Sequence, residues 1–270
     1  MTPTHDTLQF RKNAIFNTIG YIVIVAVNAM AVLLPINGQT PGEISAAYPT
    51  LFTPANVTFS IWSVIYVTLL CFIVYQCWLA FSPSQAERLR HFMERMKGWW
   101  LLSCMANACW IFAWHYHLIP VAFGIILLLL FSLVMIHRRF RIAFQSEGRE
   151  QVFIHVPFSL YLGWISIATL ANFAVLLVYW GFDTADEAQI PITNILICMG
   201  TLLAVWMILW RNNITHGLVA MWAFYGILLR RREGSPWEQH LITEVCIIAM
   251  GIIAIAISWQ LYRRRLPASS

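Results

Sequence analysis

Residues 49–66 read PTLFTPANVTFSIWSVIY, a loop with two prolines that runs into an apolar segment carrying aromatic residues. Pro54 occupies a position where a helix can begin without losing a hydrogen bond. In such a helix Phe59, Trp62 and Tyr66 follow i, i+3 and i+7 spacing and share one face. A broad apolar face whose indole N–H and phenol O–H need partners suits a flat hydrophobic ligand. It also suits plain packing between helices, which is the commoner reason for such a face.

The composition is that of an integral membrane protein. Of the 270 residues, 60% are hydrophobic and 11% are charged, and the charges cluster between long apolar runs. Eight apolar segments are candidate membrane spans: residues 14–34, 55–80, 98–117, 118–136, 153–180, 192–210, 215–229 and 241–261. Segment 215–229 is the shortest, and a re-entrant helix is the alternative there.

The distribution of positive charge predicts the orientation in the membrane. With the N-terminus inside and the spans alternating, fourteen of the 17 Lys and Arg residues lie on the cytoplasmic side, and only Arg230, Arg231 and Arg232 lie outside. Both termini are therefore expected in the cytoplasm, and the protein in the plasma (inner) membrane. The net charge of +5 is explained by this topology and by anionic headgroups, so nucleic acid is not an expected partner.

Five parts are expected along the chain: a cytoplasmic tail (1–13), a five-helix membrane core (14–180), an acidic external loop (181–191), a three-helix membrane extension (192–262) and a second cytoplasmic tail (263–270). Within the core, residues 35–54 contain repeated Pro and Gly and the apolar pair Leu51-Phe52. This segment is expected to form a turn-rich cap over the outer mouth of the bundle. The internal loops 81–97 and 137–152 carry mixed charges and no binding motif.

Two further spans carry aromatic and amide residues on one face. The third span has Trp100, Ser103, Asn107, Trp110 and Trp114, and the fifth has Pro157, Tyr161, Trp164, Ala168 and Asn172. An amide inside a bilayer is costly unless hydrogen-bonded, so Asn107 and Asn172 are expected to face inward. A hydrogen bond between helices would by itself account for both.

Depth in the membrane separates these residues from an interfacial aromatic belt. At about 1.5 Å per residue, Trp62 and Trp110 lie roughly 10 Å below the outer surface, Asn172 roughly 12 Å and Asn107 roughly 15 Å. Aromatic and amide groups of three spans thus share one layer beneath the cap. Convergent polar groups in an aromatic-walled space are typical of a small-molecule site.

These residues resemble the motifs of the TspO/translocator-protein family, the tryptophan-rich sensory proteins. The family's P-x-W-x-P-P cap and V-W-x-x-L-Y helix start are similar to Pro49, Thr53-Pro54, Ile61-Trp62 and Ile65-Tyr66. Its L-N-x-x-W is similar to Asn107 and Trp110, and its W-x-x-x-A-x-x-x-N to Trp164, Ala168 and Asn172, over about residues 14–180. The cap Trp is replaced by Leu51, the first proline of the pair by Thr53, and Pro157 precedes Trp164 by seven residues instead of four.

The resemblance implies an all-α polytopic membrane protein, a TspO-like five-helix bundle followed by about three further transmembrane helices. It implies binding of a flat hydrophobic ligand, porphyrin-like, another tetrapyrrole or sterol-like, for sensing or transport, with no catalytic residues, cofactor or metal. The expected partners are this ligand, the lipid bilayer and, as one option, a second copy of the chain in a homodimer. The predicted ligand-binding residues are Phe52, Pro54, Trp62, Tyr66, Asn107, Trp110, Trp164, Ala168 and Asn172.

Two other function classes remain as alternatives. A membrane enzyme that binds haem or modifies porphyrins would use histidines, but His115 and His117 lie at the outer ends of spans and His137 and His155 at the inner ends, which is poorly suited to a bis-His haem. The pocket layer also lacks an acid–base constellation. A secondary transporter of a small hydrophobic solute would normally place charge at mid-membrane, where Glu244 near one end of the last span is the one candidate.

Overall fold

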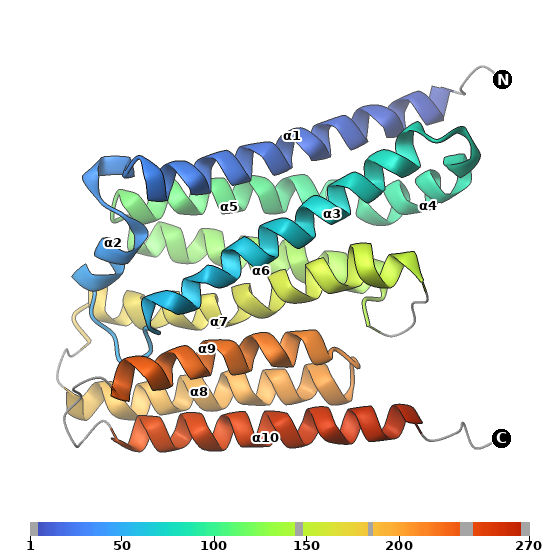
Figure 1. Ribbon diagram of the computed structural model, residues 1–270. Helices are drawn as coiled ribbons and strands as arrows, with labels where there is room; N and C mark the ends of the chain where they lie inside the picture. The colour runs from blue at the N-terminus through green and yellow to red at the C-terminus, as the bar shows by residue number, and fades with distance from the viewer. Residues whose placement is uncertain (1–4, 144–147, 183–185, 233–239, 266–270) are drawn as a thin grey trace. The chain divides into compact units, whose positions relative to one another are not determined.

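The computed structural model describes residues 5–143, 148–182, 186–232 and 240–265, and every regular element in this part of the chain is helical (Figure 1). All eight apolar segments form helices: α1 (His5–Leu33), α3 (Ile61–Phe81), α5 (Trp99–His115), α6 (Ile119–Phe140), α7 (Val156–Tyr179), α8 (Asp186–Leu209), α9 (Ile214–Arg232) and α10 (His240–Arg265). The all-α fold expected from the sequence is therefore confirmed. A helix suits these segments because it satisfies its backbone polar groups without water.

Shorter elements connect these helices. They are the 3₁₀ turns η1 (Ile36–Gly38), η2 (Asn56–Ser60) and η3 (Pro83–Gln85), the helices α2 (Pro41–Ala47) and α4 (Ala86–Met96), and the π-helical turn η4 (Gln151–His155). The cap segment thus contains η1 and α2, and the first internal loop contains α4.

Six helical stretches of the described chain are long and apolar enough to cross a membrane: Leu8–Gly38, Asn56–Phe81, Ile119–Phe140, Gln151–Tyr179, Ala188–Leu209 and His240–Arg265. The protein is therefore a multi-pass membrane protein. Of the eight predicted spans, α5 and α9 are not among the six. α5 has only 17 residues, and α9 ends in three arginines. Their full crossing of the bilayer stays a prediction.

The helix start expected at Pro54 is wrong. Pro54 lies in a segment without regular structure, and the α-helix begins only at Ile61, after η2. Ala55 has extended backbone angles, and its N–H donates to the carbonyl oxygen of Gly226 at 2.9 Å. This tertiary hydrogen bond holds residue 55 outside the helix. Phe59 consequently lies in the 3₁₀ turn and not on the α-helical face that carries Trp62.

Two segments expected as loops are helical. α4 buries Leu89, Phe92, Met93 and Met96, which are spaced as one face of an amphipathic helix. α8 begins at Asp186, so the second half of the segment expected as an acidic loop is part of a helix. The first acidic residue of that segment, at position 183, lies outside the described residues.

Reciprocal arginine contacts attach α4 to the end of α6. Arg95 Nη2 donates to the carbonyl of Phe140 at 2.9 Å, and Arg139 Nε donates to the carbonyl of Arg95 at 2.6 Å. Arg95 also pairs with Glu150 at 3.5 Å. These charges therefore satisfy carbonyl groups that the helix ends leave without an intrahelical donor.

The chain forms two compact units that interleave along the sequence. Unit 1 comprises Met1–Pro41 and Trp62–Tyr161, and unit 2 comprises Gly42–Ile61 and Leu162–Ser270. The boundaries fall inside α2, α3 and α7. Unit 2 thus combines most of the cap segment with the last three helices, a grouping that differs from the division between core and extension drawn from the sequence.

In unit 1, α5 packs along both α1 and α6 (Figure 1). Buried polar groups link its helices: Asn17 Nδ2 donates to Gln76 Oε1 at 3.0 Å, and Trp100 Nε1 donates to the carbonyl of Asn17 at 2.9 Å. The rings of Phe72, Trp100 and Phe158 meet edge to face, with centroids 5.0 to 5.8 Å apart. This aromatic cluster and the amide pair form the interior of the unit.

In unit 2, α8, α9 and α10 pack side by side (Figure 1). Gly217 of α9 permits a close approach, because a Cβ at this position would meet Ile208 Cδ1 at 2.5 Å and Ile253 Cγ2 at 3.5 Å. The start of α9 is capped by Asn213, whose Oδ1 accepts a hydrogen bond from the backbone N–H of His216 at 3.1 Å.

Candidate functional site

Trp62 and Tyr66 form a preassembled aromatic pair in unit 1. They lie one turn apart at the start of α3, and their rings stack with centroids 5.5 Å apart and planes inclined by 17°. The ring of Tyr161 meets Trp62 edge-on at 6.2 Å. Trp62 and Tyr66 both keep part of their surface exposed. Trp62 and Tyr66, which the sequence places on one helical face, therefore have stacked rings.

An amide and phenol network lies in the same unit. Asn28 Nδ2 donates to Asn107 Oδ1, and Asn107 Nδ2 donates to the Tyr161 hydroxyl, both at 2.8 Å. The buried Tyr66 hydroxyl faces Asn107 as well but does not reach hydrogen-bond geometry. Asn107 is buried, as expected, and both ends of its amide are occupied by protein groups. Its first role is thus to connect α1, α5 and α7.

Trp110 extends the aromatic surface toward the cap end of α5. Its ring stacks on Trp114 at 5.4 Å with an inclination of 20°. Trp114 in turn donates its indole N–H to the carbonyl of Pro41 at 3.5 Å. Asn37, which adopts a left-handed backbone conformation in η1, donates its amide to the carbonyl of His115 at 2.9 Å. The η1 end of the cap segment is therefore anchored on α5.

The other predicted residues lie in unit 2. Phe52, Pro54 and Trp164 are buried there. Asn172 is also buried, as expected, and donates its amide to the carbonyl of Ala168 at 2.9 Å within α7. Trp164 receives the ring of Phe59 edge-on at 6.0 Å, with the planes at 86°. Each unit thus holds its own share of the predicted residues.

A glutamine that the sequence reading did not single out organises the cap in unit 2. Gln189 Oε1 accepts a hydrogen bond from the backbone N–H of Leu51 at 3.0 Å, and Gln189 Nε2 donates to the carbonyl of Pro49 at 3.3 Å. Thr50 and Thr53 share a hydroxyl hydrogen bond of 2.8 Å across the intervening turn. The extended part of the cap is therefore held by side chains rather than by a helix.

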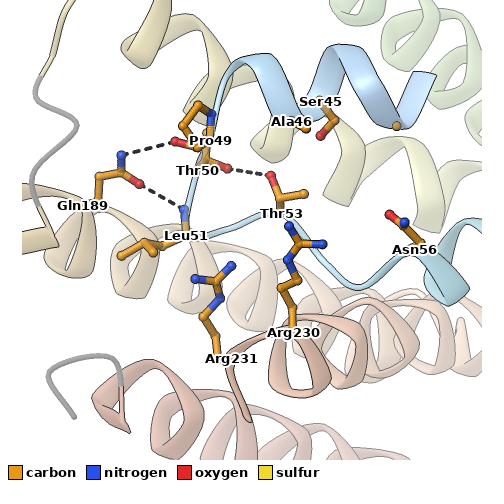
Figure 2. A pocket seen from close by; sticks show the side chains of 11 residues that line it. Ser45, Ala46, Pro49, Thr50, Leu51, Thr53, Asn56, Gln189, Arg230 and Arg231 are labelled. Atoms are coloured by element: carbon orange, nitrogen blue, oxygen red, sulfur yellow. Dashed lines mark hydrogen bonds between the residues drawn. The ribbon is translucent and has the colours of Figure 1, made fainter. Parts of the chain in front are cut away.

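These contacts frame an open cavity of about 280 Å³, here called the cap pocket (Figure 2). It is lined by Gly42, Ser45, Ala46, Pro49, Thr50, Leu51, Thr53, Asn56, Gln189, Arg230 and Arg231. Its polar and cationic lining contrasts with the aromatic lining expected from the sequence. None of the nine predicted ligand-binding residues is among the lining residues, although Phe52 and Pro54 are next in the chain to the lining residues Leu51 and Thr53.

A sequence model of the TSPO-like protein family matches residues 14–259. The chain belongs to the TSPO-like family. The match extends past residue 180, so α8, α9 and most of α10 lie within the region that defines this TSPO-like protein. No curated protein and no solved structure matches the chain.

Two of the four candidate haem histidines of the TSPO-like chain contact carbonyls of their own helices, whereas His117 contacts the Gln39 side chain and His155 Nδ1 accepts a hydrogen bond from the backbone N–H of Ala143. His115 Nδ1 contacts the carbonyl of Ile111 at 2.7 Å, and His137 Nδ1 contacts that of Leu133 at 3.2 Å. Among the described residues, no three His, Cys, Asp or Glu side chains are grouped so as to hold a metal ion. The arrangement in unit 1 offers aromatic faces and hydrogen-bonding edges, which suit recognition of a planar molecule.

Proposed function

We propose that this TSPO-like protein binds a flat hydrophobic ligand, a porphyrin, another tetrapyrrole or a sterol, and serves sensing or transport without catalysing a reaction. The observation that carries the proposal is the stacked, partly exposed pair Trp62 and Tyr66. A planar ligand would extend an aromatic stack that already exists, so little ordering of side chains would be required on binding.

The polar network supports this role indirectly. Because Asn28 and Tyr161 occupy both ends of the Asn107 amide, they fix the position of Tyr161 beside Trp62. In the apolar interior of a membrane protein such a network resists rearrangement. Asn107 thus supports the aromatic wall and, in this proposal, contacts ligand only at its edge. Trp110 supplies a second aromatic surface in the same unit.

The test is a binding titration of the purified full-length protein with protoporphyrin and, separately, with cholesterol, followed by tryptophan fluorescence. Trp62→Ala is expected to weaken binding by about 1–3 kcal/mol, because aromatic contact area is lost. Trp259→Ala is the matched control, since Trp259 is an exposed tryptophan of α10 outside the stack. If the folded Trp62→Ala variant binds both ligands with the same affinity as the wild type, the Trp62–Tyr66 stack serves only helix packing.

The orientation inferred from charge belongs to the same proposal, with both termini in the cytoplasm and the protein in the plasma membrane. Cysteines introduced at Glu43 and Ser146, in a variant lacking the six native cysteines, are expected to react with a membrane-impermeant reagent from outside and from inside, respectively. Ser146 itself lies outside the described residues. Labelling of position 146 from outside would show that the orientation is the opposite of the one proposed.

The proposed homodimer is tested by chemical cross-linking of the intact protein in membranes.

A further inference from the structure

The amide network of unit 1 has a fixed direction. Asn28 Nδ2 donates to the backbone carbonyl of Ile24 at 2.9 Å and to Asn107 Oδ1 at 2.8 Å. Because the carbonyl of Ile24 can only accept, the Asn28 amide must turn its nitrogen toward it. Asn28 in turn requires the oxygen of the Asn107 amide to face it. One backbone carbonyl therefore sets the orientation of both amides.

This direction makes the Tyr161 hydroxyl an acceptor. Asn107 Nδ2 donates to it at 2.8 Å. An amide nitrogen cannot accept a hydrogen bond, so the hydroxyl hydrogen of Tyr161 must point elsewhere. Tyr161 is fully buried, and its hydroxyl makes no other hydrogen bond within the described part of the chain. The network therefore ends in a buried donor that lacks an acceptor.

The Tyr66 hydroxyl is a second buried donor beside the same Asn107 amide. Among the described residues it has no hydrogen-bond partner. The ring of Tyr66, in contrast, is partly exposed and stacks on Trp62 with centroids 5.5 Å apart. One side chain thus joins the exposed aromatic surface to a buried hydroxyl. A ligand that lies along this ring meets a hydrogen-bond donor at the inner end.

The two hydroxyl hydrogens indicate which ligand group fits. A carbonyl oxygen has two lone pairs and can accept from both hydroxyls. A hydrocarbon edge would leave both donors unpaired, which is costly in a buried site. A carboxylate would also accept, but the side chains of this network are uncharged, so its negative charge would be buried without a counter-charge. An uncharged carbonyl group is therefore favoured.

We propose that the aromatic pair of unit 1 binds a flat, uncharged ligand that carries a carbonyl oxygen, and that the hydroxyls of Tyr66 and Tyr161 donate to this oxygen. Keto-steroids and tetrapyrroles with carbonyl groups meet this description. The inference rests on the proposed function, because it assigns a chemical class to the flat ligand. Trp62 supplies contact area for any flat molecule, whereas the two hydroxyls distinguish a ketone from a hydrocarbon of the same shape.

The test uses two probes of the same shape, 9-fluorenone and fluorene, which differ by one carbonyl group. The full-length protein is titrated with each probe by tryptophan fluorescence. The ratio of the two dissociation constants is compared between variants, which cancels the partition of each probe into detergent. Tyr66→Phe should lower the preference for fluorenone about three- to tenfold, because one hydrogen bond is lost. Tyr262→Phe is the matched control, since Tyr262 is an exposed tyrosine of α10.

Two further measurements separate ligand recognition from a structural role. The carbonyl stretch of bound fluorenone, recorded by infrared difference spectroscopy, should have a lower frequency in the wild type than in Tyr66→Phe, because a hydrogen bond weakens the C=O bond. Unliganded Tyr66→Phe should be as stable as the wild type, because the hydroxyl loses no protein partner. Tyr161→Phe should be less stable, because the bond from Asn107 is lost.

The outcomes distinguish this inference from the proposed function. If Trp62→Ala weakens the binding of both probes but Tyr66→Phe keeps the wild-type preference for fluorenone, the carbonyl assignment is wrong and the aromatic site stands. The same conclusion follows if neither probe binds while protoporphyrin or cholesterol does. If no flat molecule binds, both proposals are wrong. An equal loss of preference in Tyr262→Phe would also overturn the carbonyl assignment.

Discussion

Units 1 and 2 hold their helices together by different means. Unit 1 relies on buried polar groups that cross between helices: the Asn17–Gln76 pair at 3.0 Å and the Asn28–Asn107–Tyr161 chain at 2.8 Å per bond. Each bond satisfies groups that would be costly to leave unpaired in a membrane. The stability of unit 1 therefore depends on a few polar atoms.

Unit 2 relies on close approach at glycines. A Cβ at Gly217 would crowd Ile208, one at Gly200 would lie 3.0 Å from the ring of Phe224, and one at Gly226 would overlap the side chain of Thr58. Between helices in lipid, the burial of apolar surface gives little driving force for association. Hydrogen bonds between helices take its place in unit 1, and dense packing takes its place in unit 2. Unit 2 should accordingly be the more sensitive to an added methyl group.

The largest effect is expected for Gly226→Ala. The new Cβ would overlap Thr58 Oγ1 and crowd its Cβ and Cγ2, and it would disturb the hydrogen bond from Ala55 N–H to the Gly226 carbonyl. Overpacking of this kind costs about 3 kcal/mol. The free energy of unfolding, measured in mixed micelles with increasing denaturing detergent, checks the value.

Gly251→Ala is the control for this change, because a Cβ at Gly251 meets no atom within 4 Å. Thr58→Ala removes two of the three crowded atoms and should restore much of the stability in combination with Gly226→Ala. If Gly226→Ala and Gly251→Ala have the same free energy of unfolding, close packing is not what stabilises unit 2.

A smaller effect is expected in unit 1 for Asn107→Ala. The substitution removes the hydrogen-bond donor to the Tyr161 hydroxyl and one of the two acceptors of the Asn28 amide, which keeps its bond to the carbonyl of Ile24 at 2.9 Å. The expected cost is about 1–2 kcal/mol. A double-mutant cycle with Asn28→Ala measures the direct bond: the two changes together should cost less than the sum of the single costs. Strict additivity would show that the 2.8 Å contact contributes no energy.

The smallest effect is expected for Gln189→Ala at the cap. Loss of its bonds to Leu51 and Pro49 should cost about 0.5–1 kcal/mol and act locally. Amide hydrogen exchange of residues 50–53 should accelerate, while that of α10 stays unchanged. Gln9→Ala, which alters an exposed glutamine of α1, is the control. Uniform acceleration in all helices would mean that the cap is coupled to the whole unit.

The helices could largely be predicted from the sequence, because an apolar run of sufficient length can satisfy its backbone in a membrane only as a helix. α4 could also have been found, since Leu89, Phe92, Met93 and Met96 follow helical spacing. The start of α3 could not, because it depends on a hydrogen bond between Ala55 and Gly226, which are far apart in the chain.

The candidate site was predictable to a similar degree. The Trp62–Tyr66 stack follows from residues one helical turn apart. Asn28 could have been noticed as an amide inside a span, a rare and informative feature. The role of Gln189 carries no local signal, since its two partners lie about 140 residues earlier in the chain.

The overlap that a methyl group would create between positions 58 and 226 has an evolutionary consequence. These positions are separated by 168 residues in the chain. A larger side chain at one of them nevertheless requires a smaller side chain at the other. Relatives that carry alanine at the position of Gly226 should therefore carry glycine or alanine at the position of Thr58. The two columns of a deep alignment should co-vary, and this signal would identify the junction of η2 and α9 without any structure.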